Sequence, residues 1–426
     1  MKHFYCITFV LILLVSYVQA EETLPFIELK GHTGEILFAA FSPDAKKVVT
    51  GSKDEAARIW DIETGAELLK VDNAQYLTLS PDNKKIAMQK NNTIQILDTE
   101  TGKVLCELGN RPFRRVVFFP DGKKILTCNH EREQTDAKDL SAVIWDTESG
   151  KKLYELEGYT STNFSVVFSP DGKHIATATC SKFNGDNDPT VQIWDAETGR
   201  ELRRLDGSSG FATTMGADFP MLPAFSPDGK KIVTGSLILT DDDVKDMESI
   251  LAITWEGSGA IIWDVESGKE LQRLEGHTGT VLDGFLGTIF SVGFSPDGKK
   301  VVTSSAGSTV RIWDAESGKE IQKLEVFEFA TLAVIFASFS SDGKKVLVRD
   351  FDPHPSAFDP HPWARDRVEI VRIWDAETGK ELRITPPLNY VRAVSPDGRK
   401  AVTIGWNRSD NVSVIRIWDL ERLLSP

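Results

Sequence analysis

The feature of this sequence that most constrains its fold is the dipeptide Trp-Asp, which recurs along the chain behind an apolar residue. Its copies begin at Trp60, Trp145, Trp194, Trp263, Trp313, Trp374 and Trp418, and Leu97-Asp98 is a degraded eighth copy. Self-similarity at a period of roughly 40–50 residues indicates an array of small structural units that are stable only when they pack on one another. A chain of 426 residues can therefore be a single domain.

Two further signatures accompany each Trp-Asp and predict turns between short strands. The first, cleanest as Phe-Ser-Pro-Asp-Gly-Lys-Lys, begins at Phe41, Leu79, Phe118, Phe168, Phe225, Phe294, Phe339 and Val394. Pro fixes φ, Asp caps its own backbone and Gly tolerates positive φ, so this segment forms a tight turn before a β-branched strand. The second, a turn such as Glu-Thr-Gly-Lys or Glu-Ser-Gly-Lys, follows every Trp-Asp except the last. Each unit is predicted to contain four short antiparallel strands and no helix, which is typical of a propeller blade.

The residues around the first Trp-Asp resemble the WD-repeat family. The chain as a whole resembles an exported WD-repeat protein of the bacterial type. Gly31-His32, Ser52, Asp54 and Trp60 match the family's Gly-His, strand hydroxyl, turn Asp and Trp. The resemblance implies that His32, Ser52, Asp54 and Trp60 form a buried hydrogen-bonded tetrad. It also implies an all-β fold, a closed β-propeller of four-stranded antiparallel blades. Gly276-His277 repeats the Gly-His, but Gly307 stands where the Asp of that repeat is expected.

The ends of the chain predict how many blades there are and how the ring closes. Seven residues follow Trp418-Asp419, too few for a further turn and strand. The segment from Phe26 to His32 aligns with the fourth-strand segment from Leu271 to His277 and has no Trp-Asp before it. We therefore expect eight blades, the last completed by the N-terminal strand. Closure of this kind removes exposed sheet edges. Seven blades, the alternative, would require that the Leu97 unit be discarded.

Residues 1–20 are expected to be a signal peptide, and residues 21–426 a single propeller domain. A basic start is followed by an almost wholly apolar run from Phe4 to Val18, and Val18-Gln19-Ala20 suits signal peptidase. The run is shorter than the ~20 residues that a membrane span needs, which makes an uncleaved anchor the lesser alternative. The mature protein is then exported, periplasmic or secreted, with no membrane span after signal cleavage.

The net charge of the chain limits the classes of partner that it is expected to bind. The net charge of −14 argues against a nucleic-acid partner, because nucleic acid is bound through excess Lys and Arg. We expect a monomer.

Cys128 and Cys180 fall near the ends of equivalent strands in adjacent repeats, so they either pair or are small buried hydrophobic residues.

The length variation among the repeats points to one face as a binding face. The four strands of each unit are called a to d in chain order. The a–b and c–d turns are short and lie on one face of a propeller. The b–c and d–a connections lie on the opposite face and carry all the substantial insertions. These are residues 129–142, 181–189, 207–223, 237–259, 278–288 and 349–368. Insertions confined to one face of a repeat protein usually mark its binding side, although drift in surface loops gives the same pattern. The candidate partner-binding residues there are Phe211, Phe219, Asp241, Asp242, Asp243, Phe285 and Trp363.

The expected function is a non-catalytic scaffold that binds a protein or peptide partner through this face. A carbohydrate or small-ligand binder on the same face is the first alternative, and a metal-dependent hydrolase is the second. No cofactor and no catalytic residue are expected, because the sequence lacks a nucleophile elbow, a phosphate-binding Gly loop and a His-Glu-x-x-His motif. A duplicated segment holds the only weak metal candidates, Asp352, His354, Asp359 and His361, and a stiff aromatic-bearing loop is the preferred interpretation of it.

Overall fold

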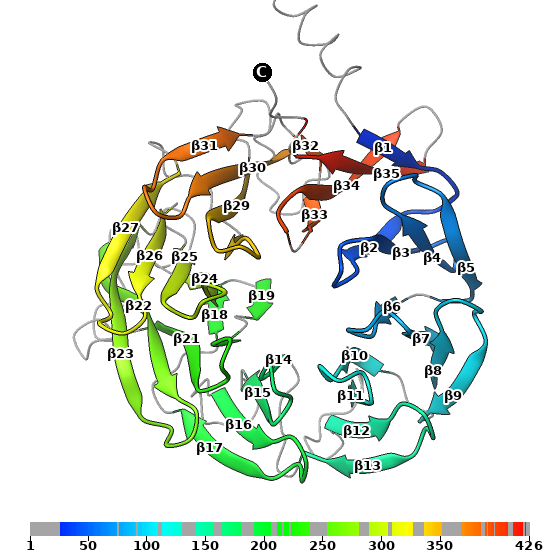
Figure 1. Cartoon of the computed structure of the whole chain (residues 1–426), viewed down its shortest axis with the longest axis horizontal. Helices are drawn as coiled ribbons and strands as arrows, with labels where there is room; N and C mark the ends of the chain where they lie inside the picture. The colour runs from blue at the N-terminus through cyan, green and yellow to red at the C-terminus, as the bar shows by residue number, and fades with distance from the viewer. Residues whose placement is uncertain are drawn as a thin grey trace, which may run out of the picture.

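The protein is a ring of eight radially arranged β-sheets (Figure 1), as seen in a computed structural model. The structure describes residues 26–74, 76–90, 93–109, 113–129, 142–156, 164–179, 191–205, 211–214, 217–220, 223–237, 254–280, 289–305, 309–326, 336–351, 368–384, 388–389, 391–395, 397–407, 412–420 and 422. These residues contain no α-helix, and in them no helix capable of crossing a membrane is found.

Blades 1 to 4 each contain four antiparallel strands in chain order. Blade 1 comprises β2 (Ile36–Phe41), β3 (Lys47–Ser52), β4 (Ala56–Asp61) and β5 (Glu67–Asp72). Blade 2 comprises β6 (Tyr76–Leu79), β7 (Lys85–Lys90), β8 (Thr93–Asp98) and β9 (Val104–Leu108). Blade 3 comprises β10 (Phe113–Phe118), β11 (Lys124–Asn129), β12 (Ala142–Asp146) and β13 (Lys152–Glu155). Blade 4 comprises β14 (Phe164–Phe168), β15 (His174–Thr179), β16 (Val191–Asp195) and β17 (Glu201–Leu205).

Blades 5 to 8 repeat this order with local additions. Blade 5 comprises β20 (Ala224–Phe225), β21 (Lys231–Leu237), β22 (Thr254–Asp264) and β23 (Glu270–Thr280), and a separate hairpin, β18 (Phe211–Thr214) with β19 (Ala217–Pro220), precedes it. Blade 6 comprises β24 (Ile289–Phe294), β25 (Lys300–Ser305), β26 (Thr309–Asp314) and β27 (Glu320–Glu325). Blade 7 comprises β28 (Phe336–Phe339), β29 (Lys345–Phe351), β30 (Val368–Asp375) and β31 (Glu381–Ile384), and the short β32 (Leu388–Asn389) also pairs with β30. Blade 8 comprises β33 (Val391–Val394), β34 (Lys400–Asn407), β35 (Val412–Asp419) and the N-terminal β1 (Phe26–Leu29).

The N-terminal strand closes the ring as the sequence predicts. β1 runs antiparallel to β35, with Phe26 opposite Trp418 and Leu29 opposite Ile415. Leu29 is buried in a cluster that also contains Ile36 and Trp60 of blade 1, so the strand joins the first blade to the last. The Leu97 unit forms a complete blade, β6 to β9, and the seven-blade alternative is therefore wrong.

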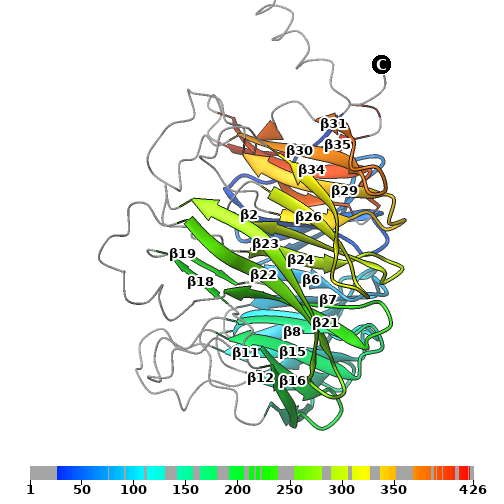
Figure 2. The same ribbon diagram turned by 90° about the vertical axis from the view of Figure 1, so that its left-hand side faces the viewer.

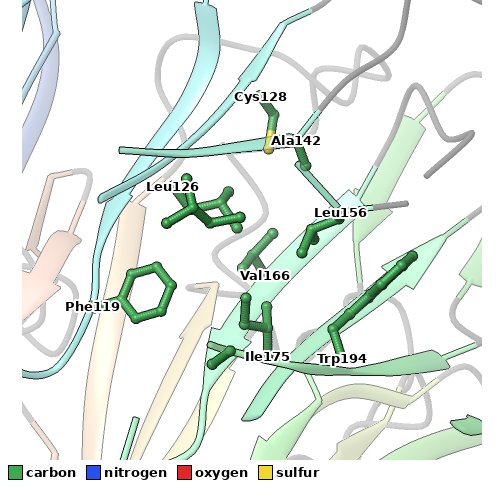
Figure 3. Close-up of a cluster of buried hydrophobic side chains, with 10 residues drawn as sticks. Phe119, Leu126, Cys128, Ala142, Leu156, Val166, Ile175 and Trp194 are labelled. Atoms are coloured by element: carbon green, nitrogen blue, oxygen red, sulfur yellow. The ribbon is translucent and has the colours of Figure 1, made fainter. Parts of the chain in front are cut away.

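Apolar side chains between neighbouring blades form the core. Figure 3 shows one such contact, in which Leu126 and Leu156 of blade 3 meet Val166 and Trp194 of blade 4. Trp194 is fully buried. Burying a side chain of this size contributes about 1.5–3 kcal/mol relative to leaving it in water. A single four-stranded sheet has two apolar faces to cover, and in the ring each face is covered by the next blade.

The two faces of the ring differ in how far the chain projects from them. The short a–b turns, and the c–d turns of blades 1 to 7, lie on one face (Figure 2). In each blade strand a is innermost and strand d is outermost (Figure 1). On the other face, β18–β19 and the ends of β22 and β23 project beyond the remaining blades (Figure 2). Parts of the segments 207–223, 237–259 and 278–288, expected to be loop insertions, are thus strand.

Candidate functional site

A buried chain of hydrogen bonds in blade 1 contains three of the four residues expected in the tetrad. The ring nitrogen Nδ1 of His32 lies 2.9 Å from Oδ2 of Asp54, and Nε2 lies 2.8 Å from Oγ1 of Thr50. The indole N–H of Trp60 donates to the same Thr50 oxygen at 2.8 Å. The hydroxyl in the tetrad is therefore that of Thr50, and the expectation for Ser52 is wrong.

The register of blade 1 explains why Thr50 takes this place. Val48 lies opposite Trp60 across β3 and β4, and Thr50 is two residues further on the same face of the sheet. Diagonal neighbours at this spacing are within reach of a large aromatic side chain. Ser52 lies beyond that reach, and its hydroxyl accepts the backbone N–H of Asp54 at 3.1 Å. It therefore caps the b–c turn.

The charges of the blade 1 tetrad are satisfied within the blade. Burial acts to raise the pKa of Asp54, but hydrogen bonds from the Thr33 N–H, His32 and Arg58 hold that pKa well below its usual value. Arg58 contacts Asp54 at 3.0 Å and Glu67 at 2.8 Å. Burial lowers the pKa of His32, and Asp54 opposes that shift. A carboxylate and an imidazole held in this way stabilise the b–c turn and leave no group poised for proton transfer.

Blade 6 contains a variant of the tetrad without a carboxylate. Nε2 of His277 lies 2.6 Å from Oγ1 of Thr303, and Trp313 donates to that oxygen at 2.8 Å. Nδ1 of His277 lies 3.0 Å from Oγ1 of Thr309, which fills the role of the missing Asp. Gly307 lies outside the described residues. Burial, reinforced by the positive charges of Arg311 and Lys323, lowers the pKa of His277 to about 3.

The pairing of Trp with Thr across strands b and c extends through most of the ring. The indole N–H donates to a Thr hydroxyl in Trp60–Thr50, Trp145–Thr127, Trp194–Thr177, Trp263–Thr234, Trp313–Thr303 and Trp418–Thr403. In blade 2 both partners are replaced together, by Leu97 and Met88, so neither side chain of this pair requires a hydrogen bond. Blade 7 keeps Trp374 but has Val348 where the Thr is expected, and Nε1 of Trp374 is buried without a partner among the described residues.

Val348→Thr is expected to stabilise the protein by about 1 kcal/mol, because the new hydroxyl would accept the unpaired indole N–H of Trp374. The matched control is Val346→Thr, also buried, two residues away on the same strand. Residue 346 lies directly opposite Trp374, two residues before the position that accepts the indole N–H in the other blades. A hydroxyl introduced at residue 346 is therefore expected to stay unpaired and to lower the free energy of unfolding by about 1–3 kcal/mol. Urea unfolding of both variants checks the difference, and a loss of stability in Val348→Thr would contradict the assignment.

The short a–b turns share one hydrogen-bond pattern, in which the turn Asp accepts from the backbone N–H two residues later and, in all blades but the third, from a Ser hydroxyl two residues earlier. In blade 1, Oδ1 of Asp44 accepts from the Ser42 hydroxyl at 2.7 Å and from the Lys46 N–H at 3.1 Å. The carbonyl of Lys46 in turn accepts the N–H of Ile62, the residue after Trp-Asp. Both short turns of a blade are therefore tied to each other.

Of the candidate partner-binding residues, the structure places two. Phe211 begins β18 and Phe219 lies in β19, on the face that carries the long connections. The remaining candidates lie outside the described residues: Asp241, Asp242, Asp243, Phe285 and Trp363, together with the metal candidates Asp352, His354, Asp359 and His361. Within the part of the chain that is described, no group of three or more His, Cys, Asp or Glu side chains could hold a metal ion. Cys180 also lies outside it.

Comparison with known proteins agrees with this architecture. The family model "WD domain, G-beta repeat" of WD40 matches residues 24–61 and 268–314. A second model, "Eukaryotic translation initiation factor eIF2A", matches residues 78–206. The crystal structure of the computationally designed Ika8 protein superposes with a TM-score of 0.58 at 19% identity, covering 93% of this chain and 99% of that one.

Three curated relatives show how distant the similarity is. The U3 small nucleolar RNA-associated protein 15 homolog of Xenopus tropicalis is 24% identical over 163 residues, 36% of this chain and 30% of its own length. Apoptotic protease-activating factor 1 of Danio rerio is 23% identical over 319 residues, 66% of this chain and 23% of its own length. An uncharacterized WD repeat-containing protein of Synechocystis sp. is 26% identical over 169 residues, 38% of this chain and 47% of its own length. The chain spans less than half the length of each.

The ring of blades and the Trp–Thr hydrogen bonds define a closed eight-bladed β-propeller. Over the matched repeats, the chain is similar to WD40-repeat β-propeller proteins. Propellers of this kind are typically protein-interaction scaffolds and are usually non-catalytic.

Proposed function

We propose that this protein is an exported scaffold that binds a protein or peptide partner through the face bearing the b–c and d–a connections. The observation that carries the proposal is the projection of blade 5 on that face (Figure 2). β22 and β23 are each 11 residues long, whereas the equivalent strands of blade 6, β26 and β27, are six. The additional residues extend the hairpin by about 17 Å at ~3.4 Å per residue.

The added length lies entirely on one side of the ring. β22 ends at Asp264 like the third strand of every complete Trp-Asp blade, so its extra residues are at its start, from Thr254. Those of β23 are at its end, where Thr280 pairs with Thr254. The hairpin β18–β19 precedes the same blade. A β-hairpin held by inter-strand hydrogen bonds is more rigid than a loop. Its contact residues therefore lose less conformational entropy on binding.

The charge of the adjoining connection suggests the chemistry of the partner. Residues 238–253 include Asp241, Asp242 and Asp243 and contain a single Lys. An acidic segment joined to β22, on a blade that is preceded by the aromatic-bearing strands β18 and β19, suits a partner with a cationic, partly apolar surface. Export follows from the leader-like residues 1–20, which make Glu21 the proposed first residue of the mature chain.

The proposal is tested by partner capture with the chain that begins at Glu21, after mass spectrometry of exported protein has checked that N-terminus. Replacing residues 238–253 by a short Gly-Ser linker is expected to abolish capture, and Asp241→Asn, Asp242→Asn, Asp243→Asn to reduce it about tenfold, roughly 1.4 kcal/mol. The matched control is Glu63→Gln, Glu100→Gln, Glu148→Gln, three exposed carboxylates on the opposite face. Equal capture by the linker variant and the unmodified chain would refute the binding face.

A further inference from the structure

The face of the ring opposite the proposed binding face carries a circle of cations. Each a–b turn places a Lys or Arg at the same position, directly after the turn, and all eight are exposed. This inner cation ring consists of Lys46, Lys84, Lys123, Lys173, Lys230, Lys299, Lys344 and Arg399. Because strand a is the innermost strand of each blade (Figure 1), these turns surround the ring axis.

The backbone fixes every member of the inner cation ring in the same way. In each blade the N–H of the residue after Trp-Asp, or after Leu97-Asp98, donates to the carbonyl of the cationic residue. The distances are 3.2 Å from Ile62 to Lys46, 2.8 Å from Ala315 to Lys299 and 2.7 Å from Leu420 to Arg399. The eight cations therefore leave equivalent, immobilised backbone positions, and a ligand does not have to order a loop to meet them.

Neighbouring a–b turns touch, so the cations are closely spaced. A Cβ atom built on Gly298 would lie 3.4 Å from Pro227 Cδ of the preceding turn, and one on Gly343 would lie 3.3 Å from Pro296 Cδ. Gly172 approaches Pro120 in the same way, at 3.8 Å. These Gly residues also have positive φ, which makes them the residue best suited to the turn. From blade 2 to blade 7, each a–b turn therefore lies against the next.

The seven lysines of the ring are exposed, whereas several of the lysines that follow them are used within the protein. Of the seven lysines in the ring, only Lys173 is in an ion pair with a described residue, Asp171 at 3.7 Å. The lysine that follows reaches the next blade instead. Lys231 contacts Glu316 at 3.1 Å, and Lys300 donates to the Ala376 carbonyl at 3.1 Å. These second lysines join blades, and the lysines of the inner cation ring are exposed.

The local charge on this face is opposite in sign to that of the whole chain. The eight a–b turns contain 15 Lys or Arg residues against eight Asp. Each Asp is occupied by its own turn: the Ser295 hydroxyl and the Lys299 N–H hold the pKa of Asp297 below its usual value, for example. Outside this circle the c–d turns carry exposed carboxylates, at Glu63, Glu100, Glu148, Glu197, Glu266, Glu316 and Glu377. The same seven turns, from the Asp of each repeat to the residue after the Gly, contain 14 Asp or Glu and six Lys or Arg, so a positive centre is bounded by a rim with a net negative charge.

We infer that the inner cation ring is a docking surface for a short acidic peptide segment of a partner protein. The excess positive charge at the centre of this face favours an anion. The acidic rim and the net charge of −14 of the whole chain repel an anion that extends across the face. A nucleic-acid duplex or an anionic membrane would have to cross that rim. An extended peptide places alternate carboxylates about 7 Å apart and can meet cations of successive touching turns. This surface is separate from the one in the proposed function and does not depend on it.

The test measures binding of a fluorescently labelled eight-residue polyaspartate peptide to the folded chain by anisotropy. The inner variant carries Lys46→Gln, Lys84→Gln, Lys123→Gln, Lys230→Gln, Lys299→Gln and Lys344→Gln. The matched outer variant carries Lys103→Gln, Lys151→Gln, Arg200→Gln, Lys269→Gln, Lys319→Gln and Lys380→Gln, six exposed cations of the c–d turns on the same face. Both lose the same charge, so only position differs. Circular dichroism and urea unfolding check that both are folded.

The inner variant is expected to bind the peptide at least tenfold more weakly, and the outer variant within about threefold of the unmodified chain. At 0.15 M salt the Debye length of ~8 Å limits the effect of distant charges. Equal weakening in both variants would overturn the proposal, because bulk charge would then account for binding. Inositol hexakisphosphate, a DNA duplex and phosphatidylserine vesicles are measured in parallel. Tighter binding of any of them than of the peptide would overturn the choice of a peptide segment.

Discussion

Removal of Phe26–Leu29 is expected to prevent formation of a stable monomeric ring. The four residues pair with Ile415 to Trp418 of β35, and without them β35 becomes an open sheet edge beside an uncovered part of blade 1. Leu29 is 4% exposed, and truncating a buried Leu to Ala alone costs about 2–5 kcal/mol. Loss of the whole strand should approach the 5–15 kcal/mol of net stability typical of folded proteins. Size exclusion and urea unfolding measure the result.

A rescue experiment separates loss of closure from general misfolding. A synthetic peptide of residues 24–34 added to the truncated chain should restore monomeric protein and cooperative unfolding, since an open sheet edge accepts a strand in trans. The same peptide with Leu29→Asp should fail, because the cluster around Ile36 and Trp60 cannot bury a carboxylate. A chain truncated only to residue 24 is the control for length. Normal stability after removal of Phe26–Leu29 would refute a closing role for β1.

The fold could be predicted because the signatures that specify it are local. A Pro-Asp-Gly turn is dictated by φ preferences and side-chain capping within a few residues, and it recurs eight times with little variation. Counting strands between these turns left one strand missing at the C-terminus and one unassigned at the N-terminus. Their pairing followed from the need to cover an edge, and the register of Phe26 opposite Trp418 bears this out.

The details of the tetrad could not be predicted in the same way. Thr50 and Ser52 are both small hydroxyl residues on the same face of β3, and the sequence alone does not say which one a Trp ring reaches. That depends on the register of β3 with β4, which sets Val48 opposite Trp60. The length of β22 and β23 was likewise hidden, because Gly-Ser-Gly at 257–259 favours a loop and the ladder with β23 overrides that preference.

The charge pattern shows a different limit of sequence reasoning. A net charge of −14 is a sum over the whole chain, and it describes the electrostatic field only at a distance from the protein. Lys46 and Glu63 are separated by 17 positions in the chain, yet the ring sorts their equivalents into an inner and an outer circle on one face. Such sorting is a property of radial symmetry and appears only once the blades are arranged in space.

Lowering the pH from 7 to 5 is expected to remove about 2 kcal/mol of stability through His277 alone. In the unfolded chain this His takes up a proton with a pKa near 6.5, whereas in the folded protein burial and Arg311 lower its pKa to about 3. Below pH 6.5 the unfolded state therefore binds a proton that the folded state does not, and stability is lost as the pH falls toward 3. The slope in that range is about 1.4 kcal/mol per pH unit.

His32 provides the matched comparison, since it occupies the equivalent position but has Asp54 as a partner. Urea unfolding between pH 7 and pH 4.5 is compared for the unmodified chain, His277→Gln and His32→Gln. The His277→Gln protein should lose less stability on acidification than the unmodified chain, by about 2 kcal/mol at pH 5. His32→Gln should change the pH dependence less, because the carboxylate of Asp54 offsets the effect of burial on the pKa of His32. An unchanged pH dependence of stability in His277→Gln would mean that the imidazole of His277 is protonated or reached by water in the folded state. The hydrogen bonds of His277 with Thr303 and Thr309 would then be wrong.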